Sequence, residues 1–318
     1  MLEQTGKLIS MVHPHFGPTR LERAASLSTP GREVYLKLET DLPTGSFKVR
    51  GAVHALSVNL SKGGVRSVVA ASTGNHGAAV AYAGRLLGVP AVIFLPTNPN
   101  SVKAARIRDL GATLVETGVD LSAAIDAARA HATSQSGAFF LHDAEDPDIP
   151  AGTAAIGREV VEQLPAVEAI YVPMGDTALI RGVAAAAKEL RPTIRIIGVV
   201  AEQAPAYYLS WQTGAAVETD SVNTIADGLA VRRPLAPNVA AIRALVDEVE
   251  RVSEQEMLAA IARLHFDEQV TAEPAGAAAT AAWLKRGGPE RTVVLLVTGG
   301  NIAPDVMQAA LKNRKSEV

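Results

Sequence analysis

Short runs of β-branched residues alternate with longer alanine-rich helical patterns along this chain of 318 residues. This alternation is typical of parallel strands, because their ends can be joined only by a crossover, usually a helix. Most of the runs are apolar on both faces, as expected of a sheet that helices cover on each side. The predicted strands are Val34–Leu38, Ser67–Ala71, Ala91–Leu95, Thr113–Glu116, Ala138–His142, Ala169–Pro173, Arg195–Val200, Val249–Val252 and Thr292–Val297. The fold class is therefore α/β.

The length of the chain exceeds what a single hydrophobic core usually covers, which favours two lobes. The stretch His142–Pro150 is polar, contains proline and lacks periodicity, so it is the best internal crossover between lobes. We predict a small domain, residues 49–142, inserted into a discontinuous large domain, residues 1–48 and 143–318. Each is expected to be an open, twisted, mostly parallel sheet flanked by helices.

Composition excludes several classes of function. The formal net charge is −3 and charged residues make up 20% of the chain, so a nucleic-acid partner is not indicated. Cysteine is absent, which removes disulfides, thiolate nucleophiles and cysteine-based zinc sites. No apolar run approaches the length of a membrane span, and the first residues do not resemble a secretory leader. We expect a cytoplasmic protein without a membrane partner.

Four small-residue turns carry the candidate chemistry. Thr44–Gly51 holds Lys48 just ahead of a helical pattern, and such a lysine can form a Schiff base. Ser72–Gly77, Gly175–Gly182 and Thr298–Asn301 each follow a strand-like run. Ligands of open α/β sheets bind beyond the carboxyl ends of the strands, so we expect these turns to face one crevice.

The motifs in these turns resemble those of fold type II, tryptophan synthase β-like, pyridoxal-phosphate enzymes. The resemblance is to the branch of threonine and serine dehydratases and serine racemases, and it covers nearly the whole chain in the family's order. It rests on these segments: Leu38-Glu39, Ser46-Phe47-Lys48 with Arg50-Gly51, Ser72 with Gly74-Asn75-His76-Gly77, Gly175 with Leu179 and Gly182, Asp227-Gly228 with Ala230, Glu273-Pro-Ala-Gly276 and Gly299-Gly-Asn301. It implies pyridoxal 5'-phosphate as cofactor, a cofactor-binding large domain, a substrate-side small domain and a homodimer.

The resemblance also implies roles for single residues. Lys48, beside Phe47, would be the Schiff-base lysine and the base that takes the Cα proton. Asn75 would bond the phenolic oxygen of the cofactor, and Thr298 would face its pyridine nitrogen. Gly228 and Glu273 would make further cofactor contacts. The pocket for the substrate carboxylate would consist of Ser72, Thr73, Gly74, Asn75 and His76.

A phosphate needs converging backbone N–H groups at a helix N-terminus, and Gly175, Asp176, Thr177, Ala178 and Leu179 have that setting. The family usually has four or more glycines here, whereas this loop has one glycine and a carboxylate. We expect Asp176 to turn away from the phosphate and Thr177 to donate its hydroxyl. An ordinary turn with Asp176 as N-cap is the alternative.

Other charged residues near the motifs are less informative. Relatives often bind a cation near the position of Glu202, but Tyr208 stands where a second acid is expected, so a divalent or monovalent cation is doubtful and its ligands are unknown. Arg50 and Arg181 are expected to be exposed on helix faces.

The leading functional hypothesis is an ammonia-lyase that converts a 3-hydroxy amino acid, such as L-threonine or L-serine, to a 2-oxo acid and ammonia. 3-Hydroxyaspartate and phenylserine-like substrates stay open. An amino-acid racemase is the nearest alternative, since Thr73 has the hydroxyl but not the size of the serine that racemases of this group use. A synthase is disfavoured by His76, and a catalytically silent binding protein is the remote alternative. An oxidoreductase would need a Gly-x-Gly-x-x-Gly turn, and none of these turns spells it.

Overall fold

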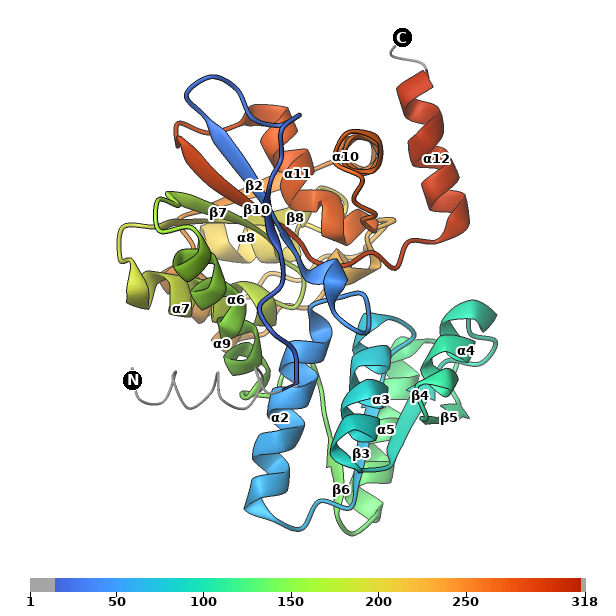
Figure 1. Cartoon of the computed structure of the whole chain (residues 1–318). Coiled ribbons are helices and arrows are strands. Elements are labelled where there is room, and N and C mark those ends of the chain that lie inside the picture. Colours follow the sequence, from blue (N-terminus) through green and yellow to red (C-terminus); the bar gives the residue numbers. More distant parts are fainter. Residues whose placement is uncertain (1–14, 316–318) are drawn as a thin grey trace. The chain divides into compact units, whose positions relative to one another are not determined.

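The computed structural model describes residues 15–315, with side chains as far as Lys312, and it confirms the α/β class with mostly parallel sheets flanked by helices (Figure 1). The chain forms two compact units. Of the described residues, the small unit comprises 15–17 and 47–153, and the large unit comprises 18–46 and 154–315. Lys48 and residues 143–153 therefore group with the small unit, although the sequence placed them in the large domain. Residues 1–14 and 316–318 of the predicted large domain lie outside the described residues.

The large unit contains a six-stranded sheet in the order β1-β2-β10-β7-β8-β9. Strand β1 is antiparallel to β2, and the remaining pairs are parallel. The strands are β1 Leu21–Arg23, β2 Glu33–Leu38, β7 Ala169–Pro173, β8 Arg195–Ala201, β9 Glu248–Val252 and β10 Thr292–Val297. The helices are η1 Glu39–Asp41, α6 Ile149–Gln163, which begins in the small unit, α7 Ala178–Leu190, α8 Ala206–Thr213, η2 Asp227–Leu229, α9 Ala236–Leu245, α10 Glu254–Asp267, α11 Pro274–Arg286 and α12 Pro304–Lys315.

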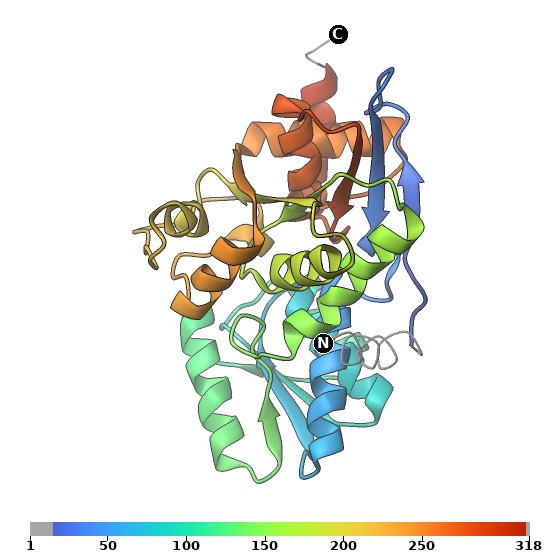
Figure 2. The ribbon, with the colours of Figure 1, turned by 90° about the vertical axis from the view of Figure 1, so that its left-hand side faces the viewer.

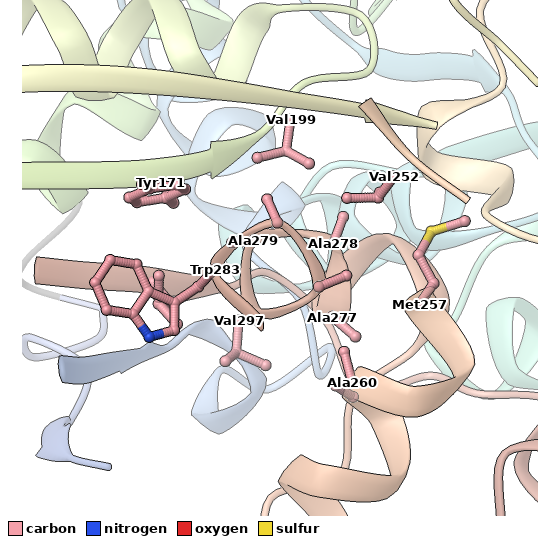
Figure 3. Packing of buried hydrophobic residues seen from close by; sticks show 14 of the residues in the cluster. Tyr171, Val199, Val252, Met257, Ala260, Ala277, Ala278, Ala279, Trp283 and Val297 are labelled. Carbon is pink, nitrogen blue, oxygen red and sulfur yellow. The ribbon is translucent and has the colours of Figure 1, made fainter. Parts of the chain in front are cut away.

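Helices cover both faces of this sheet, with α10 and α11 (orange) on one face and α6 and α7 (green) on the other (Figures 1 and 2). Helix α11 can approach the strands closely because Ala277, Ala278 and Ala279 fill its buried side (Figure 3). At its far end Trp283 meets Tyr171 edge to face, with ring centroids 5.8 Å apart. The small alanines and the large aromatic pair are thus both part of the packed core of the large unit.

The small unit contains a parallel four-stranded sheet in the order β5-β4-β3-β6. Its strands are β3 Ser67–Ala71, β4 Ala91–Leu95, β5 Thr113–Glu116 and β6 Ala138–Phe140, and its helices are α2 Lys48–Lys62, α3 Asn75–Leu87, α4 Ser101–Asp109 and α5 Leu121–Ser134. Helix α5 packs on Val69 and Phe94 of the sheet. Because β3 and β6 are parallel neighbours, the segments that follow them lie side by side.

Two helices begin with a side-chain cap of the usual kind. The Asn100 side chain accepts hydrogen bonds from the backbone N–H groups of Val102 and Lys103 at the start of α4. Ser253 and Glu256 form the capping box that opens α10. Among the described residues, no helix combines the length and apolar character that crossing a bilayer demands.

Candidate functional site

In the large unit, the turn that leads to Lys48 packs on the turn that follows β10. Ser46 forms an isolated β-bridge with Gly299. The Gly300 N–H donates to the Gly45 carbonyl at 3.0 Å, and the Asn301 amide donates to the Thr44 carbonyl at 2.9 Å. The chain is thus fixed against the Thr298 turn two residues before Lys48.

The other predicted cofactor residues of the large unit are joined by close backbone contacts. A Cβ atom on Gly299 would lie 2.5 Å from Oε1 of Glu273, and one on Gly175 would lie 2.0 Å from the carbonyl oxygen of Gly228. Gly228 in turn faces Ala275, in the first turn of α11. The structure therefore brings Gly175, Gly228, Glu273 and the Thr298 turn together, as the sequence predicted.

The loop between β7 and α7 has the shape of an anion cradle. Thr177 is the N-cap residue of α7 with φ 73°, a left-handed conformation that a threonine adopts only at a cost of about 1–3 kcal/mol. Its side chain is 1% exposed, and its hydroxyl has no hydrogen-bond partner among the described residues. The backbone is strained and a buried donor is left over, which fits a loop shaped around a bound phosphate.

Asp176 lies beside this loop but is not the N-cap residue. Its Oδ1 atom accepts the backbone N–H of Ala178 at 2.9 Å, and its carbonyl faces the Asn238 amide at 3.4 Å. The carboxylate thus occupies one of the N–H donors at the start of α7.

The two arginines near the motifs are not exposed, contrary to the prediction. Arg50 is fully buried in α2. Arg181 is half-buried in the first turns of α7, and its Nε and Nη2 atoms are buried with no hydrogen-bond partner among residues 15–312. Burial lowers the pKa of the Arg181 guanidinium, and the nearby charge of Asp176 opposes that shift. Side chains lean toward the helix N-terminus, so we expect this cation on the side of the Gly175–Leu179 loop.

In the small unit, Lys48 is the first residue of α2 and its amine forms an ion pair. Nζ lies 2.9 Å from Oδ2 of Asp143 and 5.3 Å from the centre of the Phe47 ring. The two side chains of the pair are 13% and 27% exposed. Burial acts to raise the pKa of the Asp143 carboxyl, but the neighbouring Lys48, His76 and His142 together hold that pKa below its ordinary value, with Lys48 the largest of the three.

Asp143 was not among the predicted site residues. It follows β6, which pairs with β3, so it comes out beside the predicted Ser72–Gly77 turn. The His76 ring reinforces this arrangement, since its Nε2 atom lies 3.0 Å from the Leu141 carbonyl oxygen. The sequence signal was present, because a predicted strand ended at His142 and its carboxyl end is where ligands bind.

The substrate-side turn itself is accessible. Ser72, Thr73, Gly74 and Asn75 are half-buried, and the Gly74 N–H donates to the Ser72 hydroxyl at 3.2 Å. His76 is buried instead, with its ring directed at the protein backbone. The backbone of the turn, at the start of α3, is thus available to an anion.

The residues near Glu202 do not fit a hard cation. A hollow of about 220 Å³ is lined by Glu202, Tyr208, Glu250, Arg251 and Lys285. The Arg251 guanidinium stands 4.6 Å from the centre of the Tyr208 ring, and the Lys285 amine donates to the Arg251 carbonyl at 3.0 Å. Two positively charged side chains thus line this hollow, which disfavours a metal ion there. Within residues 15–312, no three His, Asp or Glu side chains are grouped so that they could bind a metal ion.

Comparison with known proteins places these turns in a family. The model of the pyridoxal-phosphate dependent enzymes matches residues 12–299, so the chain belongs to this family and its cofactor is pyridoxal phosphate. The L-threonine ammonia-lyase of Geobacter sulfurreducens is 39% identical over 274 residues, which are 86% of this chain and 68% of that one.

Solved structures agree with this assignment. The maize serine racemase superposes with a TM-score of 0.90 at 26% identity, covering 99% of this chain and 98% of that one. Threonine deaminase isoform 2 of Solanum lycopersicum gives a TM-score of 0.89 at 28% identity, with 98% and 93% covered. The fold is therefore fold type II of these enzymes.

Proposed function

We propose that the protein is an ammonia-lyase that removes water and then ammonia from a 3-hydroxy amino acid, with Lys48 as the catalytic residue. The observation that carries the proposal is the packing of Ser46 on Gly299, which fixes the chain two residues before Lys48 against the turn expected to hold the pyridine ring. The similarity to the threonine ammonia-lyase of Geobacter sulfurreducens supports the reaction class.

The residues present fit the cofactor. The phosphate would be held by the loop of Gly175, Asp176, Thr177, Ala178 and Leu179, where the buried hydroxyl of Thr177 has no partner among the described residues. We add Arg181 as a phosphate ligand, because two of its nitrogens, buried without a partner in the described part of the chain, belong to the first turns of the same helix. Thr298 would face the pyridine nitrogen, and Gly228 and Glu273 would line the ring. The bound cofactor supplies an electron sink for the pair of electrons released at Cα.

The small unit would supply the acid and base chemistry. Lys48 would hold the cofactor covalently, and once the substrate has displaced it the free amine takes the Cα proton. Asp143, at 2.9 Å, then stabilises the resulting ammonium. Asn75 would bond the cofactor's phenolic oxygen, and the Ser72–His76 turn at the start of α3 would bind the substrate carboxylate.

The test combines cofactor mapping with product analysis. Protein loaded with pyridoxal phosphate and reduced with borohydride should carry the cofactor on Lys48, and L-threonine or L-serine should yield a 2-oxo acid and ammonia. Lys48→Ala should lower the rate by about 10⁴-fold or more, since a nucleophile and a general base are lost together. Exposed Lys62, at the other end of α2, offers the matched control Lys62→Ala. Cofactor on another lysine, or equal rates, would sink the proposal.

A racemase is the second candidate, supported by the likeness to the maize serine racemase and by the half-buried Thr73 in the substrate-side turn. Inversion needs a second acid or base on the face of Cα opposite Lys48, and a hydroxyl can serve. Measuring D-serine beside pyruvate from L-serine separates the two reactions, and Thr73→Ala should remove only inversion. The homodimer and the cytoplasmic location stay predictions.

A further inference from the structure

The Lys48–Asp143 ion pair raises the question of which group balances the negative charge of Asp143 during the proposed reaction. The Asp143 side chain is 27% exposed, and a partly buried carboxylate is stabilised by a positive group beside it. Lys48 fills that role at 2.9 Å. In the proposed reaction, however, Lys48 is first engaged by the cofactor and then must be neutral to act as a base. Asp143 needs another counter-charge during these stages.

The neighbouring histidines compensate Asp143 less strongly than Lys48 does. His142 Nδ1 lies 3.9 Å from Asp143 Oδ1, beyond hydrogen-bond distance, and it accepts the backbone N–H of Ala144 at 3.2 Å. His76 donates its Nε2 proton to the Leu141 carbonyl, and its buried Nδ1 has no partner among the described residues. Burial lowers the pKa of His76, and the charge of Asp143 opposes that shift.

The other charged groups of this segment do not provide a counter-charge. Glu145 is exposed and paired with Arg129, and Asp146 adds a further carboxyl whose Oδ1 accepts the backbone N–H of Asp148. Lys62 lies 3.6 Å from Asp148. The segment after β6 is thus rich in negative charge, and the cations near it are directed at other carboxylates.

We propose that Asp143 selects a substrate that carries a positive charge on its β-substituent, that is, a 3-hydroxy amino acid with a terminal amine. Lys48 Nζ must come within about 3 Å of the substrate Cα to take its proton. Asp143 Oδ2 is 2.9 Å from that nitrogen, so a group one or two bonds beyond Cβ reaches the carboxylate. Such an ammonium pairs with Asp143 while Lys48 is neutral. A 3-hydroxyaspartate side chain would be repelled.

The inference rests on the proposed function, and matched ligand pairs test it. L-2,4-Diaminobutyrate and L-2-aminobutyrate differ by the terminal amine, and neither has a leaving group on Cβ. Spectral titration of the cofactor-loaded protein should give a dissociation constant on the order of tenfold or more lower for the diamino acid, the value of a charge-assisted hydrogen bond. Equal constants in the wild-type protein would overturn the inference.

Asp143→Asn keeps the size of the side chain and removes its charge, so the preference should disappear. Glu145→Gln is the matched control, because it removes one negative charge two residues away from an exposed pair. Cofactor uptake and far-ultraviolet circular dichroism establish that each variant is folded. A preference that survives in Asp143→Asn, or disappears in Glu145→Gln, would contradict a direct role of Asp143.

Measurements of turnover provide a second test of the inference. 2,4-Diamino-3-hydroxybutyrate is threonine with an ammonium on its terminal carbon, and we expect its kcat/KM to exceed that of threonine about tenfold or more in the wild type and not in Asp143→Asn. The two levels of failure are distinguishable. A protein that binds no cofactor on Lys48 refutes the proposed function, whereas a loaded protein that prefers threonine refutes only the selection by Asp143.

Discussion

The two units hold their predicted site residues by different physical means. In the large unit (the packed half), backbone contacts hold them, since a Cβ atom on Gly175, Gly276 or Gly299 would lie 2.0 to 2.5 Å from an oxygen atom. In the small unit (the charged half), the corresponding turn is open around Gly74, and the site is defined by the charges of Lys48 and Asp143. A side that holds an unchanging cofactor can be close-packed. Residues that select among substrates can be substituted by residues of another charge without a change in the backbone.

The largest effect on stability and cofactor binding should come from disrupting a close glycine contact in the large unit. Gly175→Ala sets a methyl group against the Gly228 carbonyl oxygen, and backbone cannot move aside as a flexible side chain can. We expect a loss of about 1–3 kcal/mol in the free energy of unfolding, together with loss of cofactor binding. Urea denaturation and cofactor titration measure the two.

The matched control for this substitution is Gly17→Ala. Gly17 has no heavy atom within 4 Å of the position that an added methyl group would take, and its φ is not positive. A Gly175→Ala protein as stable as Gly17→Ala would show that the contact between Gly175 and Gly228 is not tight in solution.

The next effect concerns Arg181, the positive charge that we propose as a phosphate ligand in the packed half. Arg181→Gln should weaken binding of pyridoxal phosphate about tenfold or more, as expected for a lost hydrogen bond to a charged group. Binding of pyridoxal, which lacks the phosphate, should not change. Lys188→Gln is the control, because Lys188 lies in the same helix and pairs with Asp247 far from the loop. An equal loss for both ligands would indicate a merely structural role.

Arg181 could also act only by neutralising Asp176, whose charge lies nearby. Repeating the Arg181→Gln comparison in an Asp176→Asn background separates the two roles. If Arg181 donates directly to the phosphate, the loss persists in that background. If it acts only through Asp176, the loss vanishes.

The sequence revealed the packed half better than the charged half. Gly175 and Thr298 follow strands, so the parallel-sheet rule predicted that they lie near each other, whereas Gly228 and Glu273 came only from the family resemblance. The Lys48–Asp143 pair depends on the order β3-β6, which no local pattern encodes. Arg181 was misjudged for a similar reason, since its burial depends on the direction in which its side chain leans along α7.

The fold shows the same division between local and non-local information. The buried strands were predicted closely because their apolar runs are unbroken. Strand β1 was missed, since it is three residues long with two charged, exposed side chains and is recognisable only through its pairing with β2. The predicted strand over Ala138–His142 ends earlier, at Phe140.

The free energy of unfolding should also depend on pH through the small unit, because this unit buries a second titratable group, His54. His54 is fully buried in α2, and neither ring nitrogen has a hydrogen-bond partner among the described residues. Burial lowers its pKa below the ordinary 6.5, and the charge of Asp148 only partly opposes this. The unfolded chain therefore takes up the proton first, and stability falls as pH drops below about 6.5.

Comparing the free energy of unfolding at pH 8 and pH 5.5 should show a loss of about 1 kcal/mol from this residue. His54→Leu should remove that part of the loss, while the same change at exposed His15 should not. A pH dependence that is unchanged in His54→Leu would mean that His54 is protonated in the folded protein.

The smallest effect is expected at Thr177, where strain and function oppose each other. Glycine adopts the left-handed backbone without cost, so Thr177→Gly should raise the free energy of unfolding by about 1 kcal/mol. The same change removes the buried hydroxyl and should weaken binding of pyridoxal phosphate severalfold, whereas Thr177→Ser should keep the affinity. Destabilisation by glycine would mean that the threonine methyl contributes more packing than the strain costs. A gain in stability with a loss in affinity would show that this chain retains a strained threonine for its hydroxyl. The packed half would then depend on a side chain, that of Thr177, as well as on close packing.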